Sequence, residues 1–211
     1  MKYNSVTFGQ MEAVINKLGG LEGMEKFLQG KLIVSEYARA WREQDGVIYF
    51  NVTSDGTTGP EWISRLEKKG FRVGDYAKSI LNSHNFKPTS GIITEVAVLK
   101  GMLFSDSDRI TKKIRKEANN RDFSTPNAEL ACLIREKFSD EEIEDMGLVR
   151  VVVMHEPIKD SDGGPYLLSA RRYVAGRWLC AYYDYPDGGW SRGSGFAFAV
   201  SQVIKTKNLE S

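Results

Sequence analysis

Four short apolar segments in the last third of the sequence constrain the fold most strongly. They are rich in β-branched and aromatic residues and are separated by clusters of Asp, Gly and Pro: VRVVVMHEPI, PYLLSARRYV, RWLCAYYDY and GFAFAVSQV. This length and composition are typical of β-strands, so we expect an antiparallel sheet here. Helical and strand patterns come in blocks, and no glycine-rich strand-to-helix turn recurs. These features favour the α+β class over a doubly wound parallel sheet.

The amino-terminal residues have the pattern of a helical hairpin. Thr7 and Gln10 have the spacing of a capping box, and apolar residues follow at helical intervals. A second short amphipathic segment ends at Gly30. We therefore predict a helical hairpin appendage over residues 1–30 and an α+β domain over residues 31–211.

The central part of the chain contains two regions of strand pattern and a larger number of helix patterns. Residues 31–53 predict a hairpin with its turn at residues 42–46, and residues 92–104 predict a strand with a bulge at Gly101. Capping residues, prolines and periodicity predict central helices that begin at Thr58, Asp75, Asp106, Thr125 and Ser139.

Composition excludes several classes of protein. The 211 residues carry a formal net charge of +1, which argues against a globally basic nucleic-acid binder. No apolar stretch approaches the roughly 20 residues of a membrane helix, and the first residues lack a secretion signal, so we expect a cytoplasmic protein. Cys132 and Cys180 have no CxxC neighbour and indicate buried free thiols; no metal site or cofactor is expected.

One candidate site is catalytic. His155 and Glu156 lie at the end of an expected strand, and Asp160 and Asp162 follow in a polar loop. A histidine beside carboxylates has the chemistry of a general acid or base. This hypothesis predicts a hydrolase or transferase, although the spacing matches no metal-binding motif. The alternative is a histidine at a strand end, followed by an ordinary Asp/Gly turn.

A second candidate site is a binding site in the carboxy-terminal sheet. Arginine and aromatic residues together hold flat or anionic ligands by stacking, cation–π contacts and paired hydrogen bonds. The residues selected are Arg171, Arg172, Trp178, Tyr183, Trp190 and Arg192. Strand alternation places Trp178, Cys180 and Tyr182 on one face of the sheet and Tyr183 on the other. The alternative is that these rings build the core of the sheet.

The cluster of arginine and aromatic residues is not accompanied by a recognisable set of catalytic residues. It therefore predicts a non-catalytic cytosolic protein that holds a small polar or anionic ligand, with nucleotide-like molecules among the candidates. A third hypothesis is a DNA-binding or interaction adaptor that uses residues 7–30 and the basic segment 108–121. The acidic residues in both segments argue against it, so we do not expect a nucleic-acid partner.

A resemblance supports the domain division. The run from Met154 to Gln202, MHEPIKDSDGGPYLLSARRYVAGRWLCAYYDYPDGGWSRGSGFAFAVSQ, resembles a family of uncharacterised bacterial proteins that is common in genomes of candidate-phylum bacteria. The segments EWISRLEKKGFRVGDYAKSIL and ELACLIREKFSDEEIEDMGL are similar to the same family, so the resemblance covers roughly residues 58–202. It implies a domain that exists as a unit. It implies no activity, cofactor or catalytic residue.

Overall fold

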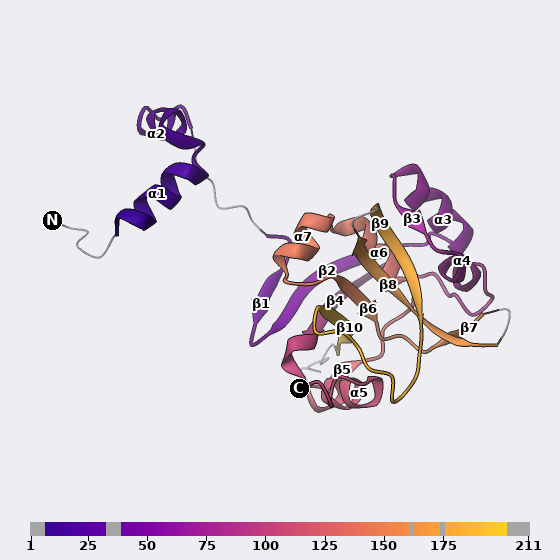
Figure 1. The fold of residues 1–211 in the computed structure, drawn as a ribbon. Coiled ribbons are helices and arrows are strands. Elements are labelled where there is room, and N and C mark those ends of the chain that lie inside the picture. The colour runs from indigo at the N-terminus through magenta and orange to yellow at the C-terminus, as the bar shows by residue number, and fades with distance from the viewer. Residues whose placement is uncertain (1–6, 33–38, 161–162, 174–175, 202–211) are drawn as a thin grey trace, which may run out of the picture. The chain divides into compact units, whose positions relative to one another are not determined.

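The computed structural model describes residues 7–32, 39–160, 163–173 and 176–201 (Figure 1). The chain divides into two compact units, residues 1–39 and residues 40–211. This division falls after Arg39, whereas the sequence pattern placed the boundary after Gly30. Each unit is described by itself.

The first unit contains two helices, α1 (Phe8–Lys17) and α2 (Gly20–Leu28). Thr7 and Gln10 form the expected capping box at the start of α1. The two helices meet closely at Gly23, where a Cβ atom would lie 1.6 Å from the carbonyl oxygen of Leu18. The helical hairpin is therefore confirmed, and only a glycine fits at this contact.

The second unit is built on one mixed sheet. Ten strands in its described part pair in the order β1-β2-β4-β10-β6-β8-β9-β3, with β5 beside β10 and β7 beside β8. Their bounds are β1 (Arg42–Gln44), β2 (Val47–Asp55), β3 (Arg72–Val73), β4 (Ser90–Lys100), β5 (Phe123–Ser124), β6 (Arg150–Val153), β7 (Ile158–Lys159), β8 (Pro165–Tyr173), β9 (Gly176–Tyr183) and β10 (Ser194–Val200). The α+β class is confirmed. Most pairs are antiparallel as expected, but β10 lies parallel to β6 and β3 lies parallel to β9.

Helices cover the two faces of the sheet unequally. One face, here called the first face, packs against α3 (Gly59–Lys68), α4 (Asp75–Leu81), α6 (Leu130–Lys137) and α7 (Asp140–Asp145) in the larger core. Within the described part of the chain, the second face packs against one α-helix, α5 (Thr111–Asn120), through Ile114 and Ala118. Figure 1 shows α5 near β5, away from α3 and α4. Part of the second face, on β8 and β9, therefore lies beyond the helix that covers it.

Two local expectations are corrected, and one lies partly outside the described residues. The first hairpin turns at Asp45–Gly46, not over residues 42–46, because both residues adopt positive φ angles (52° and 73°) as in a two-residue turn. Of the expected first strand, residues 33–38 lie outside the described residues. Gly101 is not a bulge: it begins the short 3-10 helix η1 (Gly101–Leu103) after β4.

Two helices begin later than expected. α5 begins at Thr111, not Asp106, because the buried Arg109 donates hydrogen bonds to the carbonyl oxygens of Gly101 and Phe104 and holds this stretch as a loop. α6 begins at Leu130, not Thr125. Here the Asn127 side chain accepts a hydrogen bond from the Glu129 N–H and forms a turn before the helix.

Candidate functional site

Three arginines and a tryptophan lie in one row across the sheet. The strand register places Ser194 of β10 opposite Arg150 of β6, Arg150 opposite Arg171 of β8, and Arg171 opposite Trp178 of β9. On the far side of Trp178 stands Arg72 of β3. Neighbouring strands are about 4.8 Å apart, so these side chains form a continuous row.

The row lies on the second face of the sheet. Residues an even number of positions apart on a strand share a face. Val152 lies two residues after Arg150, and Leu167 lies four residues before Arg171. Both apolar residues belong to the core under α5, so Arg150 and Arg171 are on that face as well. By contrast, Leu179, next to Trp178, belongs to the larger core on the first face. The expected alternation of β9 is confirmed.

The contacts of Arg150 and Arg171 are with aromatic rings. Arg171 Nη1 donates a hydrogen bond to Tyr182 Oη (2.7 Å), and its guanidinium lies 4.8 Å from the centre of the Tyr173 ring. The Arg150 guanidinium lies 4.9 Å from the centre of the Tyr182 ring. Neither arginine forms an ion pair with a carboxylate of the described residues, and the Nε atoms of both are buried without a hydrogen-bond partner there. We call Arg150, Arg171, Tyr173, Trp178 and Tyr182 the Arg150–Arg171 site.

Two hollows meet at this site. The first, about 280 Å³, is lined by Arg171, Tyr173, Trp178 and Cys180. The second, about 320 Å³, is lined by Arg171, Tyr173, Arg172, Val149 and Asp140. Arg171 and Tyr173 border both hollows, which are therefore adjacent.

The protonation state of Cys180 depends on its burial and on the two nearby arginines. Burial raises the pKa of the Cys180 thiol, while the positive charges of Arg171 and Arg150 act in the opposite direction. The thiol is therefore protonated at neutral pH, and it contributes an apolar surface to the first hollow.

The remaining residues selected from sequence lie outside the row, although Arg172 lines the second hollow. Arg172 points to the first face, where it pairs with Glu144 (3.1 Å) and donates to the carbonyl of Leu148 (2.8 Å). Tyr183 also points away from Trp178, and its ring stacks on Tyr185 with centroids 4.2 Å apart.

The other two selected residues are Trp190 and Arg192. Trp190 packs beside Tyr182 and Phe196, and its Nε1 donates to Thr111 Oγ1 of α5 (3.0 Å), so it is part of the smaller core. Arg192 is exposed, two residues before the row, and within the described residues no hydrogen bond or ion pair of its side chain occurs. The row therefore includes Arg171 and Trp178 from the sequence-selected set. Sequence reasoning missed Arg150, whose position depends on the pairing of β6 with β8.

His155 has a structural environment. It is buried (1% exposed), the Leu168 N–H donates to its Nε2 (3.0 Å), and its Nδ1 lies 2.7 Å from the Glu156 carbonyl oxygen. Because Nε2 accepts, the proton resides on Nδ1 and is donated to that carbonyl. Burial lowers the pKa of His155 to about 4. Both ring nitrogens are occupied by the backbone, which disfavours proton transfer to a substrate.

The carboxylates proposed beside His155 do not gather around its ring. Glu156 is exposed, Asp160 accepts a hydrogen bond from the Gly164 N–H (2.8 Å), and Asp162 lies outside the described residues. His155 and Glu156 do line a cavity of about 670 Å³, together with residues around Asn85 and Asn127.

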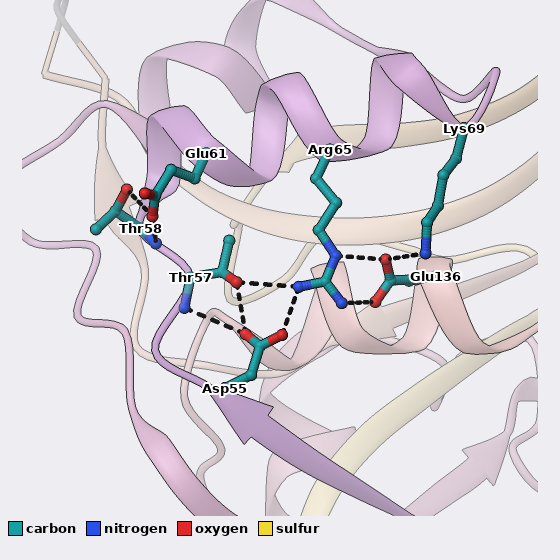
Figure 2. Close-up of polar contacts among 7 residues, drawn as sticks. All are labelled: Asp55, Thr57, Thr58, Glu61, Arg65, Lys69 and Glu136. Carbon is teal, nitrogen blue, oxygen red and sulfur yellow. Dashed lines mark hydrogen bonds and ion pairs between the residues drawn. The ribbon is translucent and has the colours of Figure 1, made fainter.

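A network of ion pairs connects the end of β2 with α3 and α6 (Figure 2). Arg65 of α3 binds Glu136 of α6 through two parallel hydrogen bonds (2.6 and 2.5 Å) and also pairs with Asp55. Lys69 donates to Glu136 (2.6 Å), and Thr57 donates to Asp55 (2.5 Å). Hydrogen bonds from Arg65 and then Thr57 lower the pKa of Asp55 to about 2. All the charges in this network are paired, so we assign it to fold stability.

The basic residues of α5 are also mostly paired. Lys112 pairs with Asp187 and Lys113 with Asp108. Arg115 donates to the carbonyl oxygens of Met154 and His155. These contacts reduce the charge that α5 offers to a nucleic acid.

Comparisons with known proteins give no relative. No protein-family model, no curated protein sequence and no solved structure matches this chain. Over the described ranges, the structure has neither a helix long and apolar enough to cross a membrane nor a group of three side chains suited to hold a metal ion. The resemblance to an uncharacterised bacterial family stays a prediction.

Proposed function

We propose that this protein is a cytosolic binding protein that holds a small anionic ligand, without transforming it, at the Arg150–Arg171 site. The observation that supports this proposal is the pair of neighbouring guanidinium groups without a carboxylate partner among the described residues. Elsewhere in the second unit, the partly buried Arg65 and the fully buried Arg135 pair with acidic side chains.

The physical argument is electrostatic. Two residues opposite each other in an antiparallel pair have Cα atoms about 5 Å apart. Two positive charges about 6 Å apart repel each other by about 3 kcal/mol at an effective dielectric constant of about 20. An anion beside Arg150 and Arg171 offsets this repulsion and gives the terminal N–H groups of the two guanidinium groups a charged acceptor.

The side chain next to Arg150 and Arg171 also favours an anion-binding site. Tyr182 holds Arg171 through its hydroxyl and Arg150 through its ring, so both guanidinium groups are held in place before a ligand binds. Such preorganisation reduces the entropy lost on binding. The contacts of His155 and α5 favour this proposal over a hydrolase or transferase and over a DNA-binding adaptor.

The test is calorimetric titration with pyrophosphate, a compact anion that two arginines bind through several oxygens. The wild-type protein should bind it, and Arg150→Gln and Arg171→Gln should each weaken binding at least about tenfold. Lys68→Gln is the matched control, because Lys68 is an exposed residue of α3, which covers the first face. Absent pyrophosphate binding, or equal affinity in Arg150→Gln and Lys68→Gln, would refute the proposal.

A further inference from the structure

The first hollow and the Arg150–Arg171 pair differ in chemistry. The first is lined by the rings of Tyr173 and Trp178 and the protonated thiol of Cys180, with Arg171 at its border. The Arg150–Arg171 pair lies on the neighbouring strands, on the same face. A ligand that uses both parts needs a flat apolar group and a separate anionic group.

The first hollow suits a flat ring. Trp178 is partly exposed and Tyr173 is 54% exposed, so both aromatic side chains are accessible to solvent. The guanidinium of Arg72 lies over the Trp178 ring, 5.4 Å from its centre, and covers part of one ring face with a second π-binding group. Aromatic and guanidinium surfaces of this kind stack on nucleobases, because every base has a π-face.

The spacing of the strands restricts how the two parts of the ligand are joined. Trp178 is one strand from Arg171 and two strands from Arg150, which corresponds to about 5 and 10 Å across the sheet. The Arg150 guanidinium reaches across β8 and lies 4.9 Å from the centre of the Tyr182 ring, and Tyr182 is four residues, about 13 Å, along β9 from Trp178. A spacer is needed between the ring and the anion, and the sugar of a nucleotide provides one.

We propose, on the basis of the proposed function, that the ligand class is a nucleoside phosphate. Its base lies in the hollow lined by Tyr173, Trp178 and Cys180, and its phosphates bind Arg150 and Arg171. Trp178 is thus a specificity residue for the base, and the two arginines provide affinity for the phosphates.

The experiment compares ADP, pyrophosphate and adenosine by calorimetry in magnesium-free buffer. ADP should bind at least about tenfold more tightly than pyrophosphate, because base stacking adds to the phosphate contacts. Trp178→Leu should remove this advantage, so that ADP and pyrophosphate bind the variant with equal affinity. Trp178→Phe, which keeps an aromatic ring at this position, should retain most of the advantage.

The outcomes separate the two proposals. If pyrophosphate binds and ADP binds no more tightly, the nucleoside assignment is wrong and the anion site stands. If neither binds, both fail. Adenosine binding that matches ADP and persists in Arg150→Gln also overturns the assignment. Pyrophosphate binding by Trp178→Leu shows that this variant is folded. If Trp178→Leu no longer binds pyrophosphate, the test uses Trp178→Phe. Equal affinities of Trp178→Phe for ADP and pyrophosphate then overturn the assignment.

Discussion

Replacing His155 should change how the stability of the protein depends on pH. In the unfolded chain, an imidazole takes up a proton as the pH falls below about 6.5. In the folded protein, burial keeps His155 neutral until about pH 4. Between these values the unfolded state binds more protons, so the free energy of unfolding falls as the pH falls. This contribution is fully present above pH 6.5 and is lost progressively toward pH 4.

The magnitude follows from the two pKa values. A difference of about 2.5 units corresponds to about 3 kcal/mol of stability lost between neutral pH and pH 4. His155→Gln removes the titrating group, while the glutamine oxygen is able to accept the Leu168 N–H that His155 Nε2 accepts. The variant should be less stable than wild type at pH 7.5, and the difference should shrink by about 3 kcal/mol at pH 4.

The assay is urea denaturation monitored by tryptophan fluorescence at several pH values between 7.5 and 4. Carboxylates titrate equally in both proteins, so the difference between the two curves isolates His155. His84→Gln is the matched control, because His84 is exposed, and it should follow the wild-type curve. A constant difference between wild type and His155→Gln across this range would refute the structural role given to this histidine.

Two further predictions concern the ion-pair network and the first hairpin. Arg65→Met should lower the free energy of unfolding by about 2 kcal/mol, because it removes charge-assisted hydrogen bonds to Asp55 and Glu136. The control Lys69→Met loses one exposed contact and should lower it by less than about 1 kcal/mol. Equal losses for the two variants in urea denaturation would contradict the role of the network. Gly46→Ala should cost at least about 1 kcal/mol, because φ is 73° and the new Cβ would lie 2.6 Å from a Leu103 methyl carbon. Gly91→Ala, with φ of 71° and open space around it, isolates the backbone cost, and a larger loss there than at Gly46 would contradict the steric argument.

Local signals in the sequence predicted the helices well. The capping boxes at Thr7, Thr58 and Ser139 all occur in the structure, because each depends on residues three positions apart. Helix starts were wrong where a distant or irregular contact decides them. Arg109, which binds carbonyl groups of the preceding loop, delays α5, and its role is invisible in a pattern of periodicity.

The candidate site was only partly predictable. Alternation along β9 correctly separated Trp178 from Tyr183, yet the two were selected together because composition alone does not assign a face. Arg150 was missed because it begins an apolar strand, RVVV, and becomes significant only when β6 pairs with β8 opposite Arg171. Pairing between distant strands depends on the packing of the whole sheet, which a single sequence does not reveal.

The most direct test of the anion site is the NMR spectrum of the arginine Nε–Hε groups during a pyrophosphate titration. Arg150→Gln and Arg171→Gln assign the two resonances. Both should move as pyrophosphate binds, because a bound anion changes the electrostatic environment of each guanidinium group. The Nε–Hε of Arg109, which donates to the Gly101 carbonyl, should stay in place. Stationary signals from Arg150 and Arg171 at saturating pyrophosphate would contradict the account.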